Sequence, residues 1–244
     1  ETLGQLTLAA NTSNTIYVRH PSSGPSPATM GNILSFSGTG TAATNVSALQ
    51  RLEGATLNLL TNFQFTGGGT VQSPSASEIR FLNSPTFNVL VGNTTGTGLG
   101  ILPWATVTTF LGDASREQID LVSDLDGTIG GAALALGALQ SYDAPTTTNG
   151  NVKATQSLTI SNNINSLLID STRSNGSVIV TISNDPPLVG QSQIVRNIIS
   201  GTIVNAGTGN SIIGGNLVDT NGVTPPGRIA IATSPNGNAG ANFF

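Results

Sequence analysis

The chain has 244 residues, of which 37% are apolar and only 8% are charged, and its net charge at pH 7 is −4. An ordinary soluble domain carries about 25% charged residues. Regular apolar clusters with so little charge exclude a disordered chain, which needs low hydrophobicity and high net charge. Gly, Ser, Thr and Asn stand where helical surfaces carry Lys and Glu, and they favour strand faces and turns. The composition therefore predicts an all-β protein.

Several features that the sequence lacks exclude particular kinds of site and partner. There is no cysteine, which excludes a disulfide framework and a thiolate metal site. No run of about 18 apolar residues occurs, so we expect no membrane insertion. The eight Lys and Arg residues are dispersed along the sequence, and this argues against nucleic acid as a partner. Glu1 has no signal-peptide pattern, so we expect either a removed signal peptide or a piece of a longer chain.

The first half alternates short apolar runs with breaks rich in Gly, Asn, Ser and Pro. Predicted strands lie at Leu3–Leu8, Ile16–Arg19, Ile33–Phe36, Leu57–Phe65, Ile79–Leu82 and Phe87–Val91. Residues 112–142 differ, because they hold most of the acids and then the Ala/Leu/Gly run Gly130–Leu139. Periodicity leaves that run open between a short helix and a pair of small-residue strands. We expect 1–144 to form one solenoid part with long loops and this irregular segment.

Residues 145–151 have the composition of a linker, and the strand rhythm tightens after them. Predicted strands follow at 158–160, 164–169, 178–182, 194–199, 203–204, 212–213 and 217–218. Asn and Gly stand at the corners between them, where they tolerate the left-handed backbone. Residues 145–244 are therefore predicted to form a second, tighter solenoid part. We expect a right-handed parallel β-helix, with a β-sandwich as the alternative.

Four segments resemble the autotransporter-associated β-strand repeat proteins of planctomycetes and related bacteria. Glu1–Leu8 (ETLGQLTL) and Gly100–Val107 (GILPWATV) look like two segments of that family, and the second is the more specific match. Leu158–Leu167 and Ile212–Leu217 are similar to two further rungs. The chain departs from the pattern at Asp113–Asp126, Pro21–Pro27 and Pro186-Pro187. The resemblance implies a secreted parallel β-helix of a large surface protein with a structural or adhesive role.

The acids of the middle segment are the best candidate for a site. Asp120, Asp124 and Asp126 are followed by Gly127, and the Asp-x-Asp-Gly pattern is typical of a calcium loop, although an EF-hand's later acid is missing. The simpler interpretation of the pattern is a solvated Asp-Gly turn. His20 is the single histidine and reads as a loop residue, and no nucleophile elbow accompanies it. Trp104 is expected to pack in the core.

These observations predict a non-enzymatic extracellular protein with no cofactor apart from calcium. We expect a structural subunit of a bacterial surface fibre or coat that self-associates head to tail through strand edges or solenoid ends. One alternative is an adhesin that binds surface glycans through Pro21–Pro27 or Gly92–Gly100. Another is a polysaccharide-degrading β-helix enzyme that uses two carboxylates.

Overall fold

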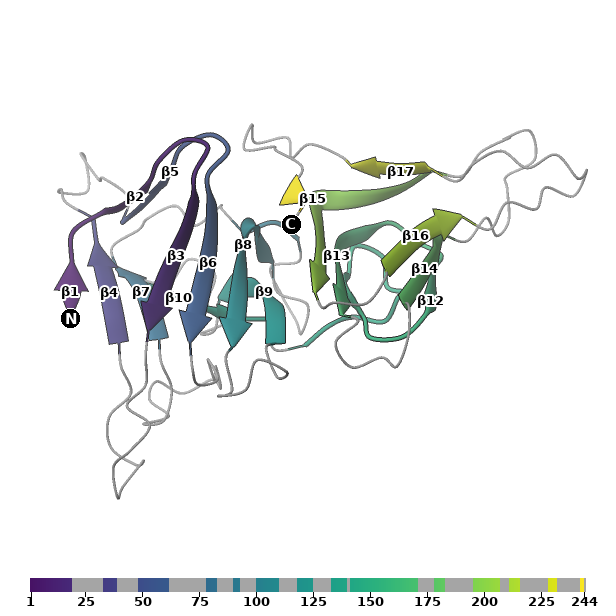
Figure 1. The fold of residues 1–244 in the computed structure, drawn as a ribbon, viewed down its shortest axis with the longest axis horizontal. Helices are drawn as coiled ribbons and strands as arrows, with labels where there is room; N and C mark the ends of the chain where they lie inside the picture. Colours follow the sequence, from purple (N-terminus) through teal and green to yellow (C-terminus); the bar gives the residue numbers. More distant parts are fainter. Residues whose placement is uncertain are drawn as a thin grey trace, which may run out of the picture. The chain divides into compact units, whose positions relative to one another are not determined.

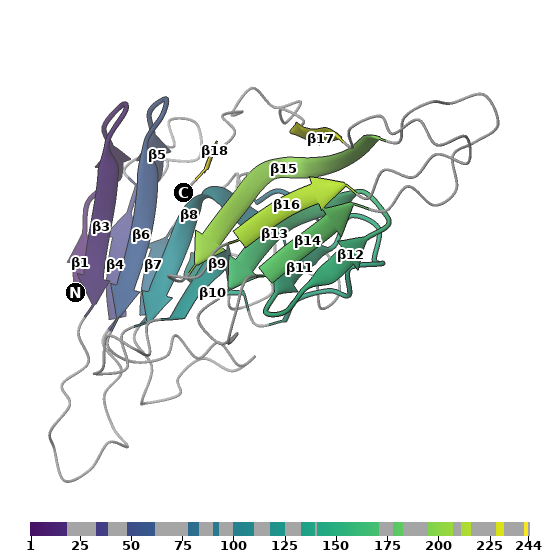
Figure 2. The same ribbon diagram turned by 45° about the vertical axis from the view of Figure 1, so that its right-hand side comes forward.

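A computed structural model shows an all-β chain that forms two compact units (Figures 1 and 2). It describes residues 1–18, 33–38, 48–61, 78–82, 90–92, 100–109, 118–124, 133–139, 141–170, 178–182, 195–206, 211–215, 228–231 and 242–243. Unit 1 comprises Glu1–Leu90 and Leu99–Gln140, and unit 2 comprises Val91–Gly98 and Ser141–Phe244. Within the described part, no helix has the length and apolar character needed to cross a bilayer.

Unit 1 stacks successive passes of the chain, which we call rungs. The first rung is β1 (Thr2–Leu3), β2 (Leu6–Leu8) and β3 (Ser13–Val18), the second is β4 (Ile33–Ser37), β5 (Leu49–Arg51) and β6 (Thr56–Thr61), and the third holds β7 (Glu78–Leu82) and β8 (Ile101–Thr109). β1, β4 and β7 pair in parallel, as do β2 with β5 and β3 with β6 and β8. The predicted strand Leu3–Leu8 is thus two strands, separated at Gly4-Gln5.

Equivalent corners in successive rungs have the same left-handed backbone. Leu8 pairs with Arg51 before the corner and Ser13 pairs with Thr56 after it. Between them Asn11 has φ 55° and Gly54 has φ 71°. A Cβ on Gly54 would lie 2.2 Å from Asn11 Oδ1, so the two corners pack directly on each other. Asn and Gly stand here because other side chains strain this conformation.

Two antiparallel strands close the third rung. β9 (Gln118–Asp124) pairs with β8, β10 (Ala133–Ala138) pairs with β7, and β9 and β10 pair with each other. They join the two parallel stacks into one curled sheet with the order β1-β4-β7-β10-β9-β8-β6-β3. The run Gly130–Leu139 therefore contains a strand, not a helix. Its alternation of Leu with Ala or Gly places Leu136 in the core.

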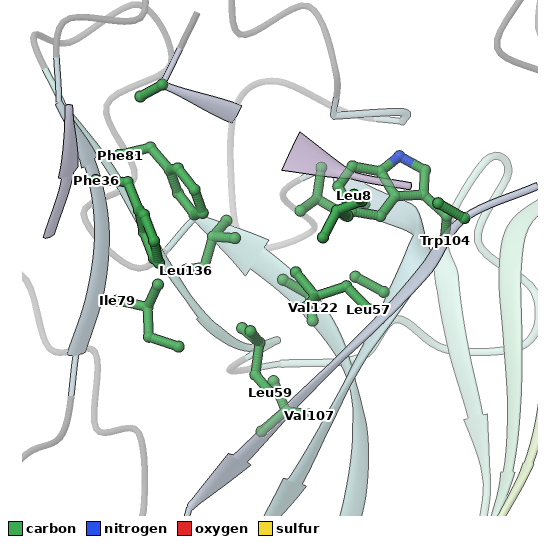
Figure 3. Close-up of a cluster of buried hydrophobic side chains, with 14 of the residues drawn as sticks. Leu8, Phe36, Leu57, Leu59, Ile79, Phe81, Trp104, Val107, Val122 and Leu136 are labelled. Atoms are coloured by element: carbon green, nitrogen blue, oxygen red, sulfur yellow. The ribbon is translucent and has the colours of Figure 1, made fainter. Parts of the chain in front are cut away.

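The core of unit 1 lies inside the curled sheet and draws side chains from all three rungs and from β9 and β10 (Figure 3). Phe36 and Phe81 pair across the second and third rungs and stack with ring centroids 5.3 Å apart. On the opposite stack Leu57 pairs with Ala105 and Leu59 pairs with Val107, and all four side chains are buried. Burying each such Leu, Val or Phe side chain stabilises the fold by about 1.5–3 kcal/mol. The repeat of apolar positions is thus what holds the rungs in register.

Unit 2 is built from parallel pairs throughout the part that is described. Its strands are β11 (Asn151–Ala154), β12 (Leu158–Ile160), β13 (Ile164–Asp170), β14 (Val178–Ile182), β15 (Val195–Ala206), β16 (Ser211–Gly215), β17 (Arg228–Ile231) and β18 (Asn242–Phe243). β11, β13 and β15 form one stack that also takes β17 and β18, and β12, β14 and β16 form the other. This mostly parallel pairing is not that of an antiparallel β-sandwich.

Two predictions for unit 2 need correction. Residues 195–199 and 203–204 of two predicted strands belong to one strand, β15, which bends at Gly201, where φ is 69°. Residues 145–151 are not a linker between the units, since they form a turn and the first residue of β11. Asn149 N donates to Asn163 O (2.8 Å), which fastens that turn to the rest of unit 2. The chain passes between the units after Gln140.

Candidate functional site

Asp120 and Asp124, two of the predicted calcium ligands, lie on the inner face of β9. Asp120 is directly opposite Val107 of β8, and Asp124 is opposite Leu136 of β10. Both of these neighbours belong to the core of unit 1. The two aspartates are accordingly only 4% and 3% exposed, and each has a polar or charged interaction. The sequence suggested a solvated turn or a calcium loop, whereas these two acids are buried in a strand.

The extended backbone keeps Asp120 and Asp124 apart. Four residues of strand span about 13 Å, while oxygens that share a calcium ion lie about 2.4 Å from it. Asp120 is therefore too distant to join Asp124 on one ion. Asp126 lies outside the described residues, as do His20 and the loop Pro21–Pro27. In the described residues no three His, Cys, Asp or Glu side chains are grouped to hold a metal. Calcium at Asp124 and Asp126 stays a prediction.

Trp104 belongs to the core of unit 1, as the sequence predicted. β8 shifts register with β9 between Ile101 and Thr106, and Pro103 lies in this irregular stretch, where its missing N–H costs the sheet no ladder bond. The Arg51 guanidinium lies 5.3 Å from the Trp104 ring centroid, and Arg51 Nε donates to Ala55 O (2.7 Å). Burial lowers the pKa of Arg51 below its usual value. Arg51 and Trp104 therefore have a packing role.

A buried polar cluster in unit 2 escaped the sequence reading. Asn165 Nδ2 donates to Asn151 Oδ1 (2.7 Å) and to Val91 O (2.9 Å), and Ser166 Oγ donates to Asn151 Oδ1 (2.7 Å). Ser200 Oγ donates to Asn165 O (2.6 Å). The cluster links β11, β13 and β15 with the segment at Val91. Its one signal in the sequence is an Asn inside the apolar run Ile164–Ile169.

The backbone at Gly92 lies close against the Asn165 side-chain amide. Its φ is 116°, and a Cβ there would lie 2.4 Å from Asn165 Nδ2. Asn165 Oδ1 is buried and has no hydrogen-bond partner among the described atoms. Asn165 therefore acts as a donor that fixes Val91 and Gly92 against β13. The hydrogen bonds of this cluster join three neighbouring strands to the segment at Val91.

The single lysine also has a structural environment. Lys153 Nζ lies 3.5 Å from Asp170 Oδ2 and 5.4 Å from the Tyr142 ring centroid. The Lys153 and Asp170 side chains are 14% and 3% exposed, and they lie on the neighbouring strands β11 and β13. A buried ion pair of this kind fastens one strand to the next, and removing one partner would leave an uncompensated charge.

The outer edge of the first rung is a further candidate, as a place where another strand could be added. β1, β2 and β3 each have one parallel partner strand and, within the described residues, no strand on their other side. Tyr17 of β3 is 52% exposed and Leu3 of β1 is 42% exposed. A row of unpaired backbone N–H and C=O groups is a template for another strand. The sequence predicted self-association through strand edges or solenoid ends, but not the role of β3.

Comparison with models of known protein families, with curated proteins and with solved structures finds no match. The family resemblance of Glu1–Leu8 and Gly100–Val107 therefore stays a prediction from the sequence. Glycan binding by the predicted loops also stays a prediction, because Pro21–Pro27 and most of Gly92–Gly100 lie outside the described residues.

Proposed function

We propose that the chain is a structural module of an extracellular bacterial fibre or coat and that it self-associates through strand edges. The observation that carries this proposal is the repeated parallel stacking of rungs, which ends in unit 1 on strands that have no further partner among the described residues. Each of the two units is then a short right-handed parallel β-helix, since parallel crossover connections are right-handed in about 98% of cases. Low charge and the resemblance to secreted repeat proteins support an extracellular location.

A mechanical role fits the way in which the rungs are held. Strand ladders and rows of apolar side chains need neither charge nor cofactor to maintain a rod. Asn58 Oδ1 adds a polar row on the other face of the stack by accepting from Thr106 Oγ1 (3.2 Å) and Thr108 Oγ1 (3.0 Å). Each rung offers its outer strands for pairing with the next rung, so a longer structure can be built by repeating the same kind of contact. Such a module supplies stiffness and a surface for joining copies.

Light scattering across a concentration series, with negative-stain microscopy of the same samples, tests the proposal. We expect the average mass to rise with concentration and ordered assemblies to be visible. Resistance to protease should rise in parallel, because association covers strand edges that are otherwise accessible. A constant monomer mass at every concentration, with isolated particles on the grid, would contradict self-association.

A further inference from the structure

We propose that β3 pairs with β3 of a second copy, antiparallel, about a two-fold axis at Thr15. This inference rests on the self-association proposed above and specifies the contact that makes it. It differs from head-to-tail growth, in which the first rung would meet a different surface of the next copy.

The hydrogen bonds of β3 determine which of its backbone groups are free. Thr56 N donates to Thr12 O (2.9 Å), and a parallel ladder then uses every second residue of the strand. Asn14, Ile16 and Val18 therefore direct their backbone groups to β6. The N–H and C=O groups of Ser13, Thr15 and Tyr17 point to the other side, where the structure describes no strand.

The other outer strands of the described sheets are shorter than the six residues of β3, and some edges are covered. β9 and β10 occupy the edges of β8 and β7. In unit 2, Asp143 covers the edge of β11: it forms a parallel bridge with Val152, its N donates to Asn151 O (2.7 Å), and its Oδ2 accepts from Asn151 N (2.9 Å). Edges left in water usually carry Lys, Pro or a bulge that prevents pairing. β1, β2 and β3 contain no charged residue and no proline.

The β3 edge of a second copy offers hydrogen-bond partners for the outward N–H and C=O groups of Ser13, Thr15 and Tyr17. In an antiparallel pair centred on Thr15, Ser13 of one copy is opposite Tyr17 of the other, and Thr15 is opposite Thr15. These are the positions whose N–H and C=O groups are free, so each pair exchanges both of its bonds. No like charges meet, because β3 is uncharged. The half-exposed Tyr17 ring gains a neighbour across the new pair.

The test uses charge at the proposed axis. Thr15→Lys and Thr15→Glu each place like charges opposite one another, so each variant alone should associate about tenfold more weakly than the wild type. An equimolar mixture of the two should recover association, because opposite charges then face each other. Thr15→Val keeps the backbone N–H and serves as the control, which should associate like the wild type. Sedimentation equilibrium measures all four samples.

A second variant tests the backbone directly. Thr15→Pro removes the outward N–H but no bond to β6, so it should abolish pairing and leave the thermal midpoint and circular dichroism unchanged. If the wild type associates and these variants match it, or if the mixture does not recover, the β3 contact is overturned while the proposed function stands. Recovery in the mixture cannot arise from head-to-tail contacts. A wild type that remains monomeric would overturn both proposals.

Discussion

At the scale of single residues, one asparagine in each unit uses its side-chain amide in the opposite way. Asn58 in unit 1 accepts hydrogen bonds from Thr106 and Thr108 with its Oδ1 atom. Asn165 in unit 2 donates to Asn151 and Val91 with its Nδ2 atom, and it is fully buried. A carboxylate keeps the acceptor and loses the donor. The same substitution should therefore have different consequences at the two positions.

We predict that Asn165→Asp strongly destabilises unit 2. Its carboxylate would face two acceptor oxygens with no donor, and leaving a charge buried and uncompensated costs about 3–5 kcal/mol. Those surroundings raise the pKa of the introduced acid, so the loss should grow as pH rises above its ordinary value of about 3.9. Urea denaturation at pH 4 and pH 7 measures the difference. Asn58→Asp is the comparison at a half-buried site and should cost less than about 1 kcal/mol, since its carboxylate still accepts both hydroxyls and keeps part of its contact with water. Equal losses at the two positions would contradict the assigned roles.

At the scale of elements, β9 and β10 end the parallel stack of unit 1. They are the antiparallel members of an otherwise parallel arrangement, and each covers one strand of the third rung. The pair is attached to the core by Val122 and Leu136, which lie among the core side chains in Figure 3. Without this pair, β7 and β8 would present unpaired edges. The antiparallel strands therefore act as a cap.

We predict that Leu136→Asp detaches the cap and exposes the edges beneath it. The introduced carboxylate would lie in the core between Ile79 and the buried Asp124, which is itself acidic, so β10 should lose its contact with the core. Amide exchange by mass spectrometry should show lost protection in β7, β8, β9 and β10, while β3 and β6 retain theirs. Leu136→Met conserves volume and should cost less than about 1.5 kcal/mol. Loss of protection throughout unit 1 would instead mean that the cap is not a separable element.

At the scale of the whole molecule, the chain forms two cores that share no side chain. One centres on residues such as Leu59 and Phe81, the other on residues such as Leu167 and Val180. The chain enters unit 2 at Val91–Gly98 and returns to unit 1 before it completes unit 2. Unit 2 is therefore built from two separate stretches of the sequence, and among the described residues each core consists of side chains from its own unit. Separate cores imply separate unfolding transitions.

We predict that core substitutions shift only the transition of their own unit. Leu59→Ala should lower the stability of unit 1 by about 2–5 kcal/mol, and Leu167→Ala should do the same for unit 2. Trp104, the single tryptophan, lies in unit 1, so its fluorescence follows that unit alone. The fluorescence midpoint should fall with Leu59→Ala and stay unchanged with Leu167→Ala, while far-UV circular dichroism responds to both. A common shift in fluorescence would show that the two cores unfold together.

Much of the local structure could be predicted from residue pattern. Alternating apolar residues located strands such as Ile79–Leu82 and Val178–Ile182, since burial of one face needs a period of two. The site was harder, because Asp120 and Asp124 look like loop ligands until β8 and β10 are placed beside them. No periodicity distinguishes an acid on a strand's inner face from one in a turn. The donor role of Asn165 likewise depends on Val91, far away in the sequence.

The sequence by itself determined that this chain is a charge-poor, turn-rich all-β protein whose strands are short, because composition and local propensity act residue by residue. Only the tertiary structure decided which strands are neighbours, that β9 and β10 close one edge, and that β3 is left open. Pairing depends on contacts between residues far apart in the chain, and loop closure and core packing select among many registers. The edge at Thr15, where we place the contact between copies, is therefore a property of the fold.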